Sequence, residues 1–156
     1  MCGRFTLTSD METLSYRFAD IAHMQLDYTP RYNIAPSQPV ISIISDKNSQ
    51  RMGYFNWGLV PFWASDKKIG HNMINARSET LHQKPAYKRL LASKRCLIPA
   101  TGFFEWKKEN KKNNQCTSSL KINSSLLLLD FGTVGNQNQE TIITHVQLLQ
   151  QSLTRL

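Results

Sequence analysis

The stretch VISIISDKNSQRMGYFNW, residues 40–57, carries the clearest secondary-structure pattern in this sequence. Its two halves, residues 40–45 and 51–57, are rich in β-branched, aromatic and other apolar residues. The polar residues 46–50 between them suit a turn. The stretch therefore predicts a β-hairpin.

Toward the N-terminus, the pattern predicts a strand followed by a helix. Residues 4–8 (RFTLT) suit a short strand, and Ser9 or Asp10 can cap a helix that follows. Residues 28–39 are rich in turn formers and predict a loop. The apolar face of the helix is expected to consist of Met11, Leu14, Phe18 and Ile21.

Toward the C-terminus, short strands alternate with loops. Residues 58–68 predict a loop, and residues 80–91 a short helical stretch that contains Pro85. Residues 95–99 and 102–107 predict two strands separated by a turn. With 156 residues the chain fits a single α+β domain. We expect a curled, barrel-like sheet, mixed or antiparallel, with flanking helices.

Positive charge and aromatic side chains gather in the same part of the chain. The net charge is +8, and residues 1–112 hold 17 Lys/Arg against 9 Asp/Glu and 14 of the 15 aromatic residues. Cations meet phosphates and aromatic rings stack on bases, so this mixture favours single-stranded nucleic acid as a partner. The alternative is a basic surface around an ordinary aromatic core.

Other features exclude several classes of protein. No run of 18 apolar residues and no secretory signal is visible, so we expect a cytoplasmic protein associated with the nucleoid or replication fork. Three cysteines at positions 2, 96 and 116 form no disulfide framework, and the four histidines lack ligand spacing. We therefore expect no metal, no cofactor and a monomer.

Cys2 is the residue with the most distinctive chemistry. Removal of Met1 would expose a 1,2-aminothiol whose α-amine has a pKa of about 7.7 to 8.0, so part of it is nucleophilic at neutral pH. The amine can add to an aldehyde, and the thiol can then close a thiazolidine ring. The alternative is that a cysteine at this position is incidental.

Four further polar residues could assist such chemistry. Asn75, Arg77 and Glu79 lie in INARSET, and Glu105 lies in ATGFFEW. A carboxylate between aromatic residues suits general acid/base work, an Asn can orient an oxygen, and an Arg can hold a phosphate. Each also has a structural interpretation, as a turn residue, an ion pair or a cap.

Five segments together resemble one family. MCGRF (1–5), RYNIAPSQ (31–38), WGLVPFW (57–63), INARSET (74–80) and KRCLIPATGFFEW (94–106) resemble the SOS-response-associated peptidase (SRAP) family of abasic-site processing proteins in content, order and spacing. The resemblance covers residues 1–112. It implies an α+β fold with a basic channel for single-stranded DNA and a role in the DNA damage (SOS) response.

The resemblance also implies a mechanism. Cys2, freed of Met1, would form a stable thiazolidine crosslink with the ring-opened sugar of an abasic site. The same family chemistry implies autocatalytic, protease-type removal of whatever precedes the cysteine, and lyase-type release. By position, Asn75 would orient the sugar, and Glu105 would be the acid/base for ring opening.

DNA-binding residues follow from the resemblance as well. Arg4 and Arg77 would hold phosphates beside the lesion. Trp63, with Pro61 and Phe62, would wedge against bases and kink the strand.

The tail, residues 113–156, departs from the family. It holds 11 Asn/Gln, 10 Ser/Thr and one aromatic residue, and the family's His-x-Arg-Met-Pro segment is absent. His145 matches nothing. A single two-nucleotide offset can turn three tail segments into family-like strands, so we interpret the tail as translated out of frame from about residues 111–115. We expect it to be poorly ordered and the sheet to be incomplete at its C-terminal end.

Two alternatives to a crosslinking enzyme remain. The chain could be an inactive, truncated remnant with at most weak, non-catalytic binding of single-stranded DNA. A cysteine hydrolase unrelated to DNA is the other, although no Cys–His–Asn arrangement in the sequence supports it.

Overall fold

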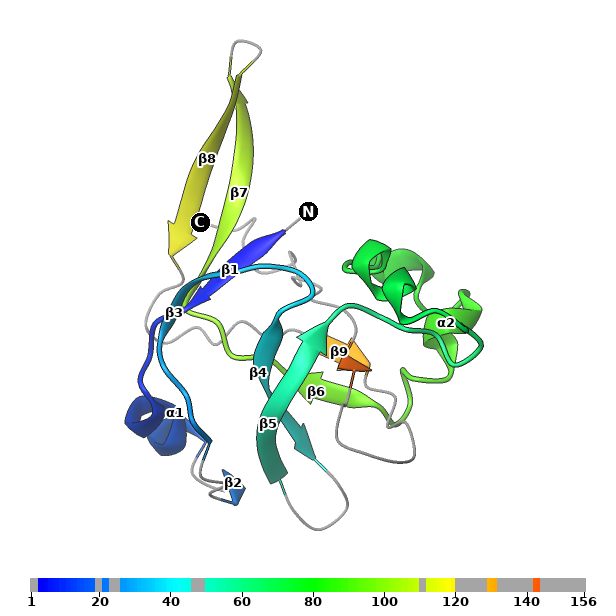
Figure 1. Ribbon diagram of the computed structural model, residues 1–156, viewed down its shortest axis with the longest axis horizontal. Coiled ribbons are helices and arrows are strands. Elements are labelled where there is room, and N and C mark those ends of the chain that lie inside the picture. Colours follow the sequence, from blue (N-terminus) through cyan, green and yellow to red (C-terminus); the bar gives the residue numbers. More distant parts are fainter. Residues whose placement is uncertain are drawn as a thin grey trace.

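The computed structural model describes residues 3–18, 21–22, 26–45, 50–109, 112–119, 129–131 and 142–143. Cys2 and most of residues 113–156 lie outside these ranges. Two small sheets and a few short helices make up the described fold (Figure 1). The predicted α+β class is therefore confirmed.

The first sheet has β1 in its interior. Its four strands follow the order β3-β1-β7-β8, and every pairing in it is antiparallel. Phe5 of β1 pairs with Ile34 on one side and Phe103 on the other. The strands are β3 (Arg31–Ile34), β1 (Arg4–Leu7), β7 (Gly102–Glu109) and β8 (Lys112–Ser119).

The second sheet contains the hairpin predicted from residues 40–57. Its strands pair from Pro39↔Asn56 to Ser45↔Gln50, and β6 lies on the other side of β4. The sheet order is β10-β5-β4-β6-β9, with β2 also paired to β5. The strands are β2 (Ile21–Ala22), β4 (Pro39–Ser45), β5 (Gln50–Trp57), β6 (Arg95–Leu97), β9 (Leu129–Phe131) and β10 (Ile142–Ile143).

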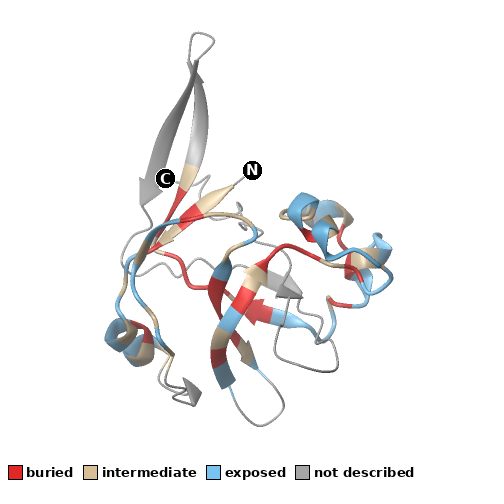
Figure 2. Cartoon of the chain, viewed as in Figure 1, coloured by how far each residue is buried: buried red, intermediate tan, exposed pale blue. Residues whose placement is uncertain are grey.

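Most of the core lies where the two sheets face each other. Phe5 of β1 and Trp57 of β5 are each 1% exposed, and their ring centroids lie 5.5 Å apart. Figure 2 shows buried residues along β1, β4, β5 and β6. Within the described residues the two sheets do not close into a barrel, so the structure differs from the expected barrel-like arrangement in its lack of closure.

Two local expectations also differ from the structure. The helix α1 (Met11–Arg17) begins at its cap Asp10, as expected, but ends before Phe18, and Ile21 lies in β2. Residues 31–34, expected to belong to a loop, form β3. β3 is recognisable as a strand through its pairing with β1, since only its last residue is buried.

The segment between β5 and β6 is a helical lobe. It contains the 3₁₀ helices η1 (Lys67–Asn72) and η2 (Ser78–Thr80), followed by α2 (Pro85–Lys88). A small apolar cluster holds the lobe together: Leu59, Leu81, Tyr87 and Leu90. Figure 1 shows this lobe beside the second sheet, on the side away from α1.

The tail contributes three of the described strands. β8 pairs along the full length of β7, β9 pairs with β6, and β10 pairs in parallel with β5. The remaining tail residues, and with them the expectation of poor order, lie outside the described part of the chain. None of the helices in the described residues is long and apolar enough to cross a membrane.

Candidate functional site

β1 fixes the position of the chain immediately after Cys2. Phe5 and Leu7 are buried in the core, whereas Arg4 and Thr6 are partly exposed on the other face. Arg4 donates a hydrogen bond from Nη1 to Asn33 Oδ1 of β3, at 2.9 Å. Arg4 is therefore held to its neighbouring strand, with its guanidinium close to the N-terminal end of β1.

The C-terminal end of β1 is anchored as well. Thr101 donates its backbone N–H to Thr6 O at 2.8 Å, and Thr8 donates its own to Thr101 Oγ1 at 3.0 Å. The hydroxyl of Tyr28 donates to Leu7 O and Ser9 O, at 3.0 and 2.9 Å. Anchoring at both ends makes β1 a rigid base for the residues that precede it.

β7 brings Glu105 to the neighbouring strand. Arg4 pairs with Phe104, the residue before Glu105. The backbone of Glu105 therefore lies beside the N-terminal end of β1, as a partner of Cys2 would have to lie. The side chains of Glu105 and Cys2 are outside the described residues, so their roles stay predictions.

Asn75 is connected to β1 through the indole of Trp57. Trp57 Nε1 donates to Ile74 O at 2.9 Å, while its ring packs against Phe5. Leu59 N also donates to Met73 O, at 3.0 Å. These bonds place the INARSET segment beside the strand that follows Cys2. Asn75 is partly buried there.

Arg77 and Glu79 follow Asn75 at the surface of the helical lobe. Both are exposed, and the carbonyl of Arg77 accepts a bond from Thr80 N at 3.2 Å, which closes the turn of η2. An exposed guanidinium two residues after Asn75 can meet a phosphate without any rearrangement of the core.

The predicted aromatic wedge divides into a buried and an exposed part. Pro61 is buried, whereas Phe62 and Trp63 are 66% and 50% exposed. The two rings meet edge to face, with centroids 4.8 Å apart, and the Arg89 guanidinium lies 5.2 Å from the Phe62 centroid. Phe62 and Trp63 thus offer apolar ring surface to solvent, with a cation beside it.

Sequence reasoning missed three residues that line a small pocket. Ser37 in the turn before β4 and His71 of η1 meet at 2.6 Å between Oγ and Nδ1. Lys67 lines the same pocket. Ser37 and His71 are 34 positions apart in the sequence, so no local pattern connects them. Within the described residues, no cluster of His, Cys, Asp and Glu has the makings of a metal site.

Comparison with known proteins identifies the family of this chain. The family model described as SOS response associated peptidase (SRAP) matches residues 1–144. The chain belongs to the SRAP family. The match to this family extends beyond residue 112, where the resemblance drawn from the sequence motifs ends.

Several SRAP relatives carry functional names. "Abasic site processing protein YoaM" of Bacillus subtilis is 48% identical over 128 residues, which cover 81% of this chain and 56% of the relative. "Abasic site processing protein YedK" of Escherichia coli is 32% identical over 116 residues, 72% of this chain and 50% of the relative. The chain thus spans about half the length of these SRAP proteins.

A solved structure shows a similar fold. A Bacteroides thetaiotaomicron protein superposes with a TM-score of 0.75 at 22% identity. The superposition covers 92% of this chain and 66% of that one. At this identity the likeness concerns the fold alone.

Proposed function

We propose that this chain captures abasic sites in single-stranded DNA through Cys2, after removal of Met1. The proposal's main support is that β1, the strand after Cys2, lies beside both Glu105 and the segment that contains Asn75. Membership of a family whose relatives are named abasic site processing proteins adds the substrate class. In this proposal the protein acts in the cytoplasm, at DNA exposed during replication.

The chemistry proceeds in two balanced steps. The neutral α-amine of Cys2 attacks the aldehyde of the ring-opened sugar, and loss of water leaves an imine. The thiol then adds across the C=N bond, so that sulfur bonds to carbon and the proton passes to nitrogen. The product is a thiazolidine that joins protein to DNA.

Neighbouring residues serve positioning and proton transfer. Asn75 orients the sugar oxygen, and Glu105 exchanges the proton that opens the sugar ring and, in the reverse direction, releases the crosslink. Arg4 and Arg77 bind the flanking phosphates as charge-assisted hydrogen-bond donors. In the same proposal, the Cys2 thiol is the nucleophile for peptidase-type removal of whatever precedes it, and the Cys2 amine and Glu105, once the amine is free, give the chain its lyase character.

The exposed rings explain a preference for single strands. Phe62 and Trp63 present exposed ring surface on which bases can stack. The faces of bases are accessible for such stacking in a single strand. Pro61 is buried and shapes the loop that holds them. A kink at this point would expose the abasic sugar to Cys2.

One experiment tests the proposal directly. The purified protein is incubated with a single-stranded oligonucleotide that contains one abasic site, and the products are separated on a denaturing gel. We expect a crosslinked band with the wild type, none with Cys2→Ala, and an unchanged band with Cys116→Ala, which removes a thiol that has no free α-amine. Mass spectrometry of the intact chain checks that Met1 is absent.

The contrary results are equally clear. A crosslink that persists in Cys2→Ala, or wild-type protein that lacks Met1 yet gives no crosslink, would refute the proposal. Binding of DNA without any crosslink would instead support the non-catalytic alternative.

A further inference from the structure

A small polar pocket lies between the turn before β4 and the helical lobe. Ser37 and Asn56 form one side, and Lys67 and His71 of η1 form the other. Its volume is about 200 Å³. That is below the roughly 300–1,000 Å³ typical of pockets that enclose a drug-sized ligand or a whole base. The pocket therefore suits a small group such as a phosphate.

The backbone holds the pocket walls in place. Ser37 N donates to Trp57 O at 2.8 Å, and Trp57 N donates to Gln38 O at 3.0 Å, so the turn is tied to the end of β5. Gly58 adopts φ +146°, and a Cβ there would lie 2.5 Å from Gly70 O. Only glycine lets β5 and η1 approach so closely, and the pocket is thus formed before any ligand arrives.

The lining chemistry favours an anion. Lys67 carries a positive charge and is exposed, and no hydrogen bond or ion pair occupies it within the described residues. Ser37 and His71 add a hydroxyl and an imidazole, already joined at 2.6 Å. No described carboxylate lines the pocket. The carboxylate of Asp66, next to Lys67, accepts a hydrogen bond from Lys68 N as the cap of η1.

The pocket is connected to the proposed crosslinking site through one residue. Trp57 lines the pocket, donates to Ile74 O beside Asn75, and packs its ring against Phe5 of β1. The same buried indole therefore positions both the pocket and β1. The anion that a DNA strand bound at β1 would bring is a backbone phosphate.

We infer that this pocket binds a backbone phosphate of the single-stranded DNA, with Lys67 supplying the charge and Ser37 and His71 the hydrogen bonds. The inference rests on the proposed function, because it takes the anion to be part of the DNA substrate. It adds a contact to those of Arg4 and Arg77 and fixes the direction of the strand relative to Trp57.

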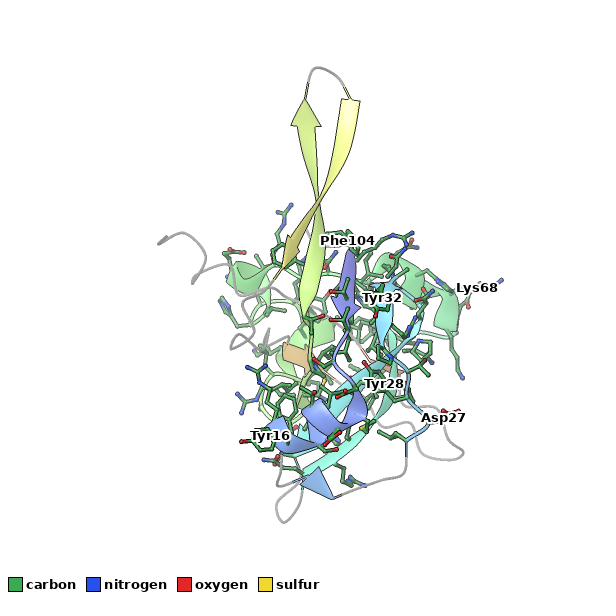
Figure 3. The ribbon with its side chains drawn as sticks, turned by 90° about the vertical axis from the view of Figure 1, so that its left-hand side faces the viewer. Tyr16, Asp27, Tyr28, Tyr32, Lys68 and Phe104 are labelled. Atoms are coloured by element: carbon green, nitrogen blue, oxygen red, sulfur yellow. The ribbon has the colours of Figure 1, made fainter. Side chains whose placement is uncertain are left out.

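The test measures binding without chemistry. Fluorescence anisotropy gives the affinity for an undamaged single-stranded oligonucleotide over a range of NaCl concentrations. Lys67→Gln should weaken binding severalfold and reduce the slope of log K against log salt by about 0.7, the value for one phosphate on a single strand. The matched control is Lys68→Gln, which removes the same charge from the next residue, outside the pocket lining and at the outer edge of the molecule (Figure 3). Its slope should stay that of the wild type.

A second variant guards against misfolding. Ser37 has φ 66°, so Ser37→Gly removes the hydroxyl and suits the backbone. We expect weaker DNA binding at an unchanged or higher melting temperature.

The outcomes separate this inference from the proposed function. If the wild type crosslinks an abasic oligonucleotide but Lys67→Gln keeps the wild-type slope, the phosphate pocket is overturned and the crosslinking proposal stands. If no crosslink forms but Lys67→Gln has a reduced slope while Lys68→Gln keeps the wild-type slope, the phosphate pocket stands and the crosslinking proposal is overturned. Equal losses in Lys67→Gln and Lys68→Gln indicate general attraction and also overturn the pocket.

Discussion

At the scale of single residues, the fold depends on side chains that bridge segments far apart in the sequence. Trp57 contacts Phe5 through its ring and Ile74 through its Nε1 hydrogen bond, and it is 1% exposed. Neither partner could be assigned from the sequence, because both lie outside the hairpin that contains Trp57. A buried indole whose N–H is satisfied in this way fixes the relative placement of β1 and the INARSET segment.

Tyr28 also joins distant segments, and its hydroxyl makes the stability of the fold depend on pH. Its hydroxyl donates to Leu7 O and Ser9 O at the end of β1. Burial, followed by the nearby Tyr54, raises the pKa of Tyr28 from 10.0 to about 12. The folded state therefore favours the neutral phenol. Its stabilising contribution is complete below pH 10 and is lost as the pH rises through about 12.

We predict that Tyr28→Phe lowers the free energy of unfolding by about 1 to 2 kcal/mol at neutral pH, because two carbonyls lose their donor. The difference from the wild type should shrink as the pH is raised from 10 to 12. Urea unfolding at several pH values measures it. Tyr16→Phe, at a residue that is 89% exposed, is the control and should have no effect. A difference that stays constant up to pH 12 would contradict the assignment.

At the scale of elements, local patterns were predictable and long-range pairings were not. The hairpin of β4 and β5 follows from residues 40–57 alone, and the Asp10 cap of α1 from one side chain whose carboxylate accepts from Thr13 N at 2.8 Å. β3 was missed because it carries exposed residues and becomes a strand by pairing with β1. The spacing of Phe18 and Ile21 in the sequence predicted that both belong to the helix, but the helix ends before Phe18.

The hairpin of β7 and β8 has little support along its outer half. β7 pairs with β1 only from Gly102 to Phe104. Residues 105–109 pair, within the described part of the chain, with β8 alone. Figure 1 shows this end of the hairpin projecting beyond β1 and away from the second sheet. A two-stranded ribbon by itself is marginally stable in water.

We therefore predict that the amides of residues 105–109 exchange with solvent roughly tenfold or more faster than those of β4, which opens only with the core. Hydrogen exchange followed by mass spectrometry measures both in one sample. β4 serves as the internal reference, since Ile43 and Ile44 pair with β5 and with β6. Equal protection in the two hairpins would show that the projecting end has further support.

At the scale of the whole molecule, the sequence predicted the class of fold and the family, while the meeting of the two sheets required the structure. The α+β class follows from short strands with one clear helix, and the motifs around Cys2 and Asn75 carry the family resemblance. The pocket of Ser37, Lys67 and His71 could not be predicted, because it joins a turn to a helix 30 residues later through Trp57 and two glycines. The interpretation of residues 113–156 as out of frame stays a prediction that the gene sequence would test.

The charge of the whole chain leads to a last prediction, in which salt has opposite effects on stability and on DNA binding. A net charge of +8 makes the folded chain repel itself, and phosphates relieve that repulsion. Screening extends over about 30 Å at 0.01 M salt and about 10 Å at 0.1 M, so this step in salt removes most of the long-range repulsion. The melting temperature should rise over that step, while the affinity for single-stranded DNA falls because counterions released into more concentrated salt gain less entropy. Thermal unfolding and anisotropy on the same preparation measure both. A fall in both quantities would mean that local ion pairs outweigh the repulsion. An affinity that does not change with salt would mean that phosphate contacts, including those assigned to Arg4, Arg77 and Lys67, do not contribute to binding.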